Sequence, residues 1–293
     1  MADFDLRFRI RHSTTYTYAR PVGFNPHLLR FLPRSDAAQQ VLSFELHVDP
    51  LPDGQATIDD AEENTAHHVW FDGEFDRMQI SATSEVQTLR SNPFDFLVYA
   101  QNRSLPIGYS APERFSLMPY VQRRPQSASL ADPVAELAAN VLQQSENRVV
   151  EFLMNLTRHL ADKISSTRRE TGVPRLPHET LALKDGACRD TSVLMIDACR
   201  SVGLAARFVS GYQEGIEPPD SRDLHARVEV YLPGGGWRGF DPTHGLAVAD
   251  RHVAVAASVS PAYTTPVIGT LQAEYVPSKM TAEIEIDILD ETE

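Results

Sequence analysis

Three residue types that can act together on an acyl group stand in order along this sequence: Cys188, His225 and Asp241. Residues 193–199 are apolar almost all round, so we predict a buried helix that begins near Cys188. A helix N-terminus offers unpaired N–H groups and a partial positive charge, which both stabilise a thiolate, the nucleophilic form of cysteine. Taken alone, a cysteine at a helix start is more often a small buried apolar side chain.

His225 precedes a predicted strand whose core-facing residues are Val228, Val230 and Leu232. Successive side chains of a strand point to opposite faces, so His225 faces away from this core. A histidine that merely fills the core would more often share the parity of the apolar residues. A general base facing a cleft fits this position better.

Asp241 ends the next predicted strand, which begins at Trp237. Its carboxylate could hold the imidazole of His225 in the tautomer and orientation that a base needs. It could equally be only a turn residue before a proline. The first interpretation requires Leu232 to pair with Gly236, because a shift of one residue would move Asp241 to the other face of the sheet.

Size and charge restrict the classes of function. The chain has 293 residues, which gives a prior of two domains, and a formal net charge of -13. Nucleic-acid binding depends on Lys and Arg contacts with phosphates, so this charge argues against it. No apolar stretch approaches the roughly 18 residues of a membrane span, and the N-terminus has no apolar signal segment. We therefore expect a cytoplasmic protein without a membrane partner.

The two cysteines predict neither a disulfide nor a metal centre. On one helix, Cys188 and Cys199 would lie about 16 Å apart along the axis, whereas a disulfide needs Cα atoms within about 7 Å. Cys188, His225 and His244 could in principle hold zinc, but a structural zinc site usually takes four ligands in short-spaced pairs. We expect no metal and no cofactor, and we expect His244 to cap the turn after Asp241.

The chain divides into two parts with different sequence patterns. The first hundred residues alternate apolar and polar side chains between turn signals, which is typical of an antiparallel sandwich. Residues 106–133 contain several prolines and are interpreted as a linker. Asp132 is a predicted helix N-cap, and Gly203 a predicted helix end. Further helices and strands are predicted at residues 134–142, 147–164, 188–202, 206–212, 226–232, 237–240, 268–275 and 282–288.

Three motif blocks, in this order, resemble those of a known family: Gly186-Ala-Cys-Arg-Asp190, Leu224-His-Ala-Arg-Val-Glu-Val-Tyr-Leu232 and Gly236-Trp-Arg-Gly-Phe-Asp-Pro-Thr-His-Gly245. The sequence resembles a bacterial member of the transglutaminase-like superfamily, whose catalytic core has papain-like architecture. The resemblance implies an α+β fold, with a β-sandwich-like domain over residues 1–120 and a catalytic domain of helices packed on an antiparallel sheet over residues 121–293. It also implies a catalytic triad of Cys188 as nucleophile, His225 as base and Asp241 as orienting acid.

The sequence departs from the family pattern near this triad. The family usually has an aromatic residue where this chain has Arg227, and Asn where it has His244. After Cys-Arg-Asp the family often has Phe-Ala-His, and here Thr191-Ser-Val193 stand instead. The triad residues are unaffected, so these changes bear on the substrate pocket and the reaction partner.

Two functions of different classes fit the sequence. The first is a cysteine-dependent enzyme that acts on peptide or amide bonds through a thioester. Transfer of the acyl group to water would make it a peptidase or amidase, which we favour slightly, and transfer to an amine would make it a transglutaminase. The alternative is a non-catalytic binding or scaffold protein built on an inactive core. The partner expected for the enzyme is a peptide or protein substrate. The oligomeric state is left open, although exposed sheet edges could support a dimer.

Overall fold

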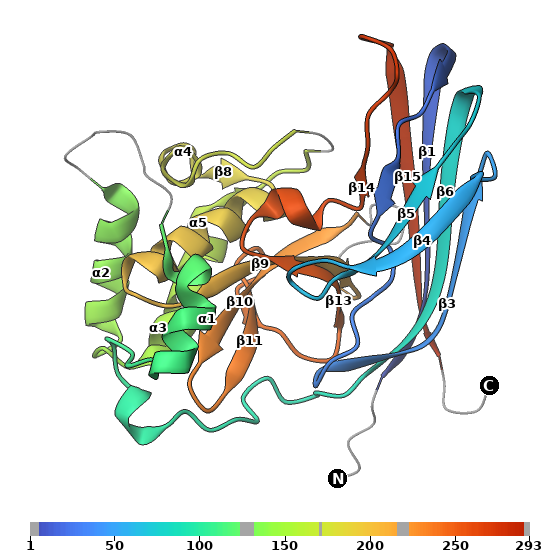
Figure 1. Ribbon diagram of the computed structural model, residues 1–293. Helices are drawn as coiled ribbons and strands as arrows, with labels where there is room; N and C mark the ends of the chain where they lie inside the picture. The colour runs from blue at the N-terminus through green and yellow to red at the C-terminus, as the bar shows by residue number, and fades with distance from the viewer. Residues whose placement is uncertain (1–5, 124–131, 170–171, 216–222, 290–293) are drawn as a thin grey trace.

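The computed structural model describes residues 6–123, 132–169, 172–215 and 223–289. A strand-rich first domain lies beside a core in which helices pack on a five-stranded sheet (Figure 1). Strands and helices are thus largely segregated along the chain. The described sheets are antiparallel, except for the two-residue parallel pair at residues 165–166 and 185–186. The predicted α+β fold class is confirmed.

The larger sheet of the first domain has the strand order β15-β1-β6-β3. Buried and half-buried side chains alternate along its strand β6, as expected for a sheet with one face against a core. The pairing of β15 with β1 brings the two ends of the described chain into one sheet (Figure 1). The four strands are β1 (Arg7–Gly23), β3 (Gln39–Asp49), β6 (Glu74–Thr88) and β15 (Ser278–Leu289).

A smaller sheet, in the order β14-β2-β5-β4, closes the sandwich. Its strands are β2 (His27–Leu29), β4 (Gly54–Asp59), β5 (Thr65–Trp70) and β14 (Val267–Ile268). The strand predicted over residues 268–275 is therefore wrong beyond Ile268, where β14 ends. Apolar side chains of the two sheets share one cluster, with Leu29 and Val69 from the smaller sheet and Met78 and Ile80 from the larger. Complete burial of such a side chain contributes about 1.5–3 kcal/mol, so this interface stabilises the first domain.

The core sheet has the strand order β12-β11-β10-β9-β13. Leu194 and Met195 of helix α5 share a hydrophobic cluster with Val228 and Val230 of strand β10, which explains the apolar character of both segments. The strands are β9 (Ala206–Gln213), β10 (His225–Leu232), β11 (Gly236–Asp241), β12 (Leu246–Ala247) and β13 (His252–Ser258). The helices are α2 (Pro133–Gln144), α3 (Val149–Lys163) and α5 (Cys188–Ser201).

Local signals in this core predicted its elements well. The side chain of Asp132 accepts a hydrogen bond from the backbone N–H of Ala135 and caps α2. Gly203 follows the end of α5 with a φ of +83°, a conformation that favours glycine. Leu232 pairs with Gly236 in the β10–β11 hairpin, which is the register that the triad hypothesis requires.

The segment interpreted as a linker contains a helix, α1 (Ala111–Val121). Ser110 and Glu113 form a reciprocal capping box at its start, and a proline in the first turn loses no hydrogen bond there. These signals for a helix start outweigh the helix-breaking tendency of the prolines. The linker interpretation is therefore wrong for residues 111–121. Residues 124–131 of the same segment lie outside the described residues.

The remaining short elements are η1 (Ala100–Asn102), β7 (Ser165–Ser166), α4 (Pro177–Leu183), β8 (Asp185–Gly186) and η3 (Pro261–Thr264). Within the described ranges, no helix combines the length and the apolar character needed to cross a bilayer. The predicted division of the chain after residue 120 stays a prediction. The strand pairing adds that residues 278–289, although last in the sequence, belong to the sheet of the first domain.

The strand-rich N-terminal part contacts the five-stranded core sheet along the outer edge of β13. Gln39 donates through Nε2 to the carbonyl of Ala254 at 2.9 Å and accepts from the N–H of Ala254 at 2.7 Å. Asn64 makes the same pair of bonds with Ala257, at 2.9 and 2.8 Å. Each buried carboxamide replaces one residue of a neighbouring strand, so the backbone groups at this edge are satisfied without another strand.

Substitution of Asn64 with Leu should lower the free energy of unfolding by about 3 kcal/mol, because the buried N–H and C=O of Ala257 lose their partners. Urea denaturation of the full chain measures this change. Gln55→Leu, on the exposed strand β4, is the control and should change stability little. Equal stabilities of the two variants would contradict this account of the interface.

Candidate active site

A buried carboxylate lies at the centre of the site. Asp241, the last residue of β11, is 0% exposed. Its Oδ2 accepts hydrogen bonds from Nε2 of His225 at 2.7 Å and from Nε2 of His252 at 3.2 Å. Its Oδ1 accepts from the backbone N–H groups of Thr243 at 2.9 Å and His244 at 3.2 Å. These four donors replace the hydration that the carboxylate loses on burial.

The electrostatics of Asp241 and His225 favour an ion pair. Burial alone would raise the pKa of Asp241, but the charge of His225 and the hydrogen bonds from His225 and His252 hold it well below its usual range. Burial alone would lower the pKa of His225, but the charge and hydrogen bond of Asp241, and then the interaction with Cys188, raise it to about 10. The imidazole therefore carries a proton at neutral pH.

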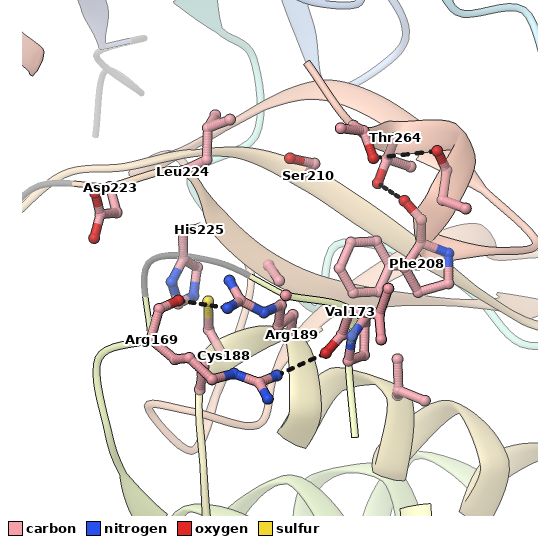
Figure 2. Close-up of a pocket in the computed structure, with 18 of the residues that line it drawn as sticks. Arg169, Val173, Cys188, Arg189, Phe208, Ser210, Asp223, Leu224, His225 and Thr264 are labelled. Carbon is pink, nitrogen blue, oxygen red and sulfur yellow. Dashed lines mark hydrogen bonds between the residues drawn. The ribbon is translucent and has the colours of Figure 1, made fainter. Parts of the chain in front are cut away.

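Cys188 is the first residue of α5, and its sulfur faces the imidazole of His225 (Figure 2). Asp190 fixes this first turn, because its Oδ2 accepts from the N–H of Ala187 at 2.9 Å. Its other carboxylate oxygen accepts from Arg169 Nη2 at 2.7 Å. The thiol is thus held at the positive end of a buried helix whose start cannot shift without breaking buried bonds.

The other cysteine has a different environment on the same helix. Cys199 is fully buried, and this burial raises the pKa of its thiol to about 12. Cys188 is partly exposed, and both cysteines are free. Only Cys188 therefore combines access to solvent with a neighbouring base.

Cys188 and His225 open into a cleft of about 1540 Å³ between the two domains, whereas Asp241 lies behind them and does not line it. One wall consists of the start of α5 with residues 166–169 and 172–178. Figure 2 shows Asp223 at the left of the view and Phe208 and Thr264 at the right, and all three line the cleft. The first domain contributes a further wall from β1 and β15: His12, Thr14, Tyr16, Met280 and Ala282.

Two residues at which the sequence departs from the family pattern lie close to the predicted triad. The ring of His244 stacks on that of His225, with 5.1 Å between centroids and 23° between planes, and its N–H belongs to the turn after Asp241. Arg227 is buried on β10. Burial lowers the pKa of its guanidinium, while the charges of Glu229 and Asp241 oppose this change. Arg227 thus places a positive charge near the buried carboxylate.

His252 and the strand β13 that begins with it were not predicted from the sequence. The available signal was a histidine directly before the alternating pair Val253 and Val255, which is the pattern that marked His225. All seven residues of β13 are buried, and three of them are alanines, so the alternation of a half-buried strand is absent.

His225, Asp241 and His252 each offer one possible metal-ligand atom, and these atoms lie within 4.8 Å of one another. The same atoms form the hydrogen bonds described above, and His225 also faces Cys188. A metal ion would have to replace the protons on both Nε2 atoms. The arrangement therefore fits a hydrogen-bonded network, and it differs from the zinc set of Cys188, His225 and His244 considered from the sequence.

Family comparison agrees with this architecture. Residues 8–87 match the bacterial transglutaminase-like N-terminal region, and residues 135–242 match the transglutaminase-like superfamily. The chain therefore carries a transglutaminase-like core preceded by a bacterial transglutaminase-like N-terminal region. Cys188, His225 and Asp241 all lie within the second match. The structure brings these three residues together, and their catalytic roles stay a prediction.

Individual relatives of this transglutaminase-like chain are distant. An uncharacterised protein of Mycobacterium tuberculosis is 24% identical over 299 aligned positions, which cover 96% of this chain and 92% of that protein. A protein-glutamine gamma-glutamyltransferase of Pseudomonas aeruginosa is 25% identical over 178 positions, which cover 58% of this chain and 24% of that protein. A candidate cysteine protease of Cytophaga hutchinsonii covers 98% of this chain and 91% of its own, with a TM-score of 0.76 at 20% identity. This last likeness shows that the two chains share a fold.

The ion pair predicts how stability depends on pH. In the folded protein the pKa of His225 is raised to about 10. Its contribution to the free energy of unfolding is therefore complete below the pKa of the unfolded chain, about 6.5, and is lost as the pH rises towards 10. The difference in free energy of unfolding between the wild type and His225→Gln should therefore be largest near pH 6 and shrink towards pH 10. Urea denaturation at several pH values measures it.

His27→Gln is the control, because the effect of this substitution on stability should change with pH in the opposite direction. Burial lowers the pKa of His27, against a weaker effect of its hydrogen bond to the Asn25 carbonyl. The contribution of His27 should therefore grow as the pH rises towards 6.5. A pH-independent difference for His225→Gln would contradict the ion pair.

Proposed function

We propose that this protein is a cysteine-dependent acyl-transfer enzyme that acts on peptide or amide bonds through a thioester on Cys188. The observation that supports this most directly is a single arrangement. A partly exposed thiol at a helix N-terminus faces an imidazole whose Nε2 is fixed by a fully buried carboxylate, at the floor of a large cleft. The bond from Nε2 to Asp241 leaves Nδ1 of His225 to exchange a proton with the thiol.

The reaction would proceed in two balanced steps. The Cys188 thiolate attacks the carbonyl carbon, His225 gives its proton to the departing amine, and a thioester remains on the sulfur. Water or an amine then attacks the thioester, His225 accepts a proton from it, and the thiolate leaves. The N–H of Cys188 lies in the first turn of α5, where it has no partner within the helix, so it is one donor to the oxyanion.

The size of the cleft favours a peptide segment as substrate. Sites for small molecules usually have volumes of about 300–1,000 Å³, and this cleft has about 1540 Å³. Its walls come from both domains, so a bound chain would contact β1 and β15 as well as α5. A protein or peptide substrate therefore fits the site better than a free amino acid.

Alkylation of the purified protein with iodoacetamide tests the nucleophile without a known substrate. At pH 6, Cys188 should react about 10- to 100-fold faster in the wild type than in His225→Ala, because an isolated thiol with a pKa near 8.5 is almost entirely protonated at that pH. Mass spectrometry locates and quantifies the label from pH 4 to 9.

Cys199 is the internal control, since the folded chain should protect it at every pH in this range. Cys188→Ala should remove the labelled peptide from the spectrum. A reaction rate at Cys188 that is slow and indifferent to His225 would overturn the proposal and favour the non-catalytic binding protein.

The acceptor of the acyl group is tested with a peptide library in the presence and absence of a primary amine. Hydrolysis, which we favour, should give peptides cleaved with addition of one water, whereas transamidation should give products that retain the amine. Cys188→Ala should abolish either product, by at least about 10³-fold in rate. Products that persist in this variant would contradict the thioester route.

A further inference from the structure

A second histidine shares the carboxylate of the predicted triad. Nε2 of His252 lies 3.2 Å from Oδ2 of Asp241, the same oxygen that accepts from His225. The rings of the two histidines are 6.2 Å apart between centroids. His252 does not line the cleft, so it cannot touch a substrate and can act only through Asp241.

The environment of His252 defines its hydrogen-bonding role. Burial lowers its pKa to about 4, and the charge of Arg227 adds to this, although the hydrogen bond to Asp241 opposes it. A neutral imidazole has one N–H, and a carboxylate can only accept, so the proton must lie on Nε2. Within the described residues, Nδ1 of His252 then has no hydrogen-bond partner.

This unpaired nitrogen distinguishes His252 from a packing residue. A buried acceptor without a partner costs about 1–3 kcal/mol, which an apolar side chain of similar size would avoid. The bond from Nε2 to Asp241 is the one hydrogen bond of the His252 side chain in the part of the chain described. The hydrogen bond to Asp241 therefore explains why a histidine occupies this buried position.

The strand that carries His252 is held from both sides. On one side, β13 passes so close to β9 that a Cβ on Gly211 would lie 2.0 Å from the carbonyl oxygen of Val253. On the other side, Gln39 of the first domain holds both backbone groups of Ala254, two residues from His252. A shift of the first domain would therefore move the imidazole of His252.

We propose that His252 is a positioning residue that fixes the Asp241 carboxylate against His225, and that the first domain takes part in the site by holding β13 through Gln39. This inference rests on the proposed function for its consequence in catalysis. With both donors on Oδ2 and two backbone N–H groups on Oδ1, Asp241 has one orientation, and His225 presents its other nitrogen to Cys188.

The test compares His252→Leu, which removes the donor, with His252→Gln, whose amide can replace it. The iodoacetamide rate at Cys188 at pH 6 should fall about tenfold in His252→Leu and recover to within about threefold of the wild type in His252→Gln. Gln39→Leu should lower the rate in the same direction. His27→Leu removes a buried histidine elsewhere and should leave the rate unchanged, even where thermal unfolding shows a similar loss of stability.

Nitrogen-15 NMR of histidine-labelled protein provides a second readout that needs no reactive cysteine. His252 should be neutral at pH 7 with its proton on Nε2, and the low-field proton between His225 and Asp241 should shift in His252→Leu but not in His27→Leu. A proton on Nδ1 of His252, or a His225–Asp241 resonance that His252→Leu leaves unchanged, would overturn the inference. So would an equal loss of the alkylation rate in His252→Leu and His252→Gln while both remain folded.

The two readouts separate this inference from the proposed function. If Cys188 of the wild type reacts slowly and without regard to His225, the proposed enzyme fails, and the NMR spectra still decide whether His252 orients Asp241. If Cys188 depends on His225 but not on His252, the enzyme stands and the positioning role fails.

Discussion

The site depends on one buried anion. Asp241 has no contact with solvent, and its charge is supported by two imidazoles and two backbone N–H groups. A carboxylate in such a place is tolerated only if nearly all of its lone pairs are used, so the positions of its donors constrain one another. The hairpin register, the turn after β11 and the packing of β13 must all be correct for that condition to hold. The orientation of His225 towards Cys188 follows from it.

The first domain belongs to this arrangement because β13 is an edge strand. An unpaired edge at the centre of a protein would leave buried N–H and C=O groups without partners. Gln39 and Asn64 supply those partners, and an apolar cluster of Phe8, Ile10, Val253 and Val255 lies beside them. The chain thus uses side chains of one domain to complete the sheet of the other. The cleft in front of Cys188 is a consequence of the same contact, since one of its walls is the sheet formed by β1 and β15.

The two cysteines show how position on one helix decides chemistry. Cys188 occupies the first turn of α5, at the positive end of the helix and the floor of the cleft, whereas Cys199 lies three turns on among apolar side chains. Burial favours the neutral thiol at Cys199. The transglutaminase-like match over residues 135–242 includes both cysteines, and only Cys188 lines the cleft.

Much of this site was predictable because its signals are local. The apolar run over residues 193–199 and the parity of His225 against Val228 and Val230 depend on neighbouring residues, and they predicted the helix and the face. The triad hypothesis then required one register of the hairpin. The helix α1 was also signalled locally, by Ser110 and Glu113, although its prolines obscured it. Other features had no local signal. His252 comes near Asp241 only because β13 pairs with β9, Gln39 reaches β13 across more than two hundred residues, and β15 joins the sheet of the first domain. Such contacts are decided by how whole surfaces pack. The sequence therefore singled out Cys188, His225 and Asp241, and only the tertiary structure decided what holds the carboxylate of Asp241 in place.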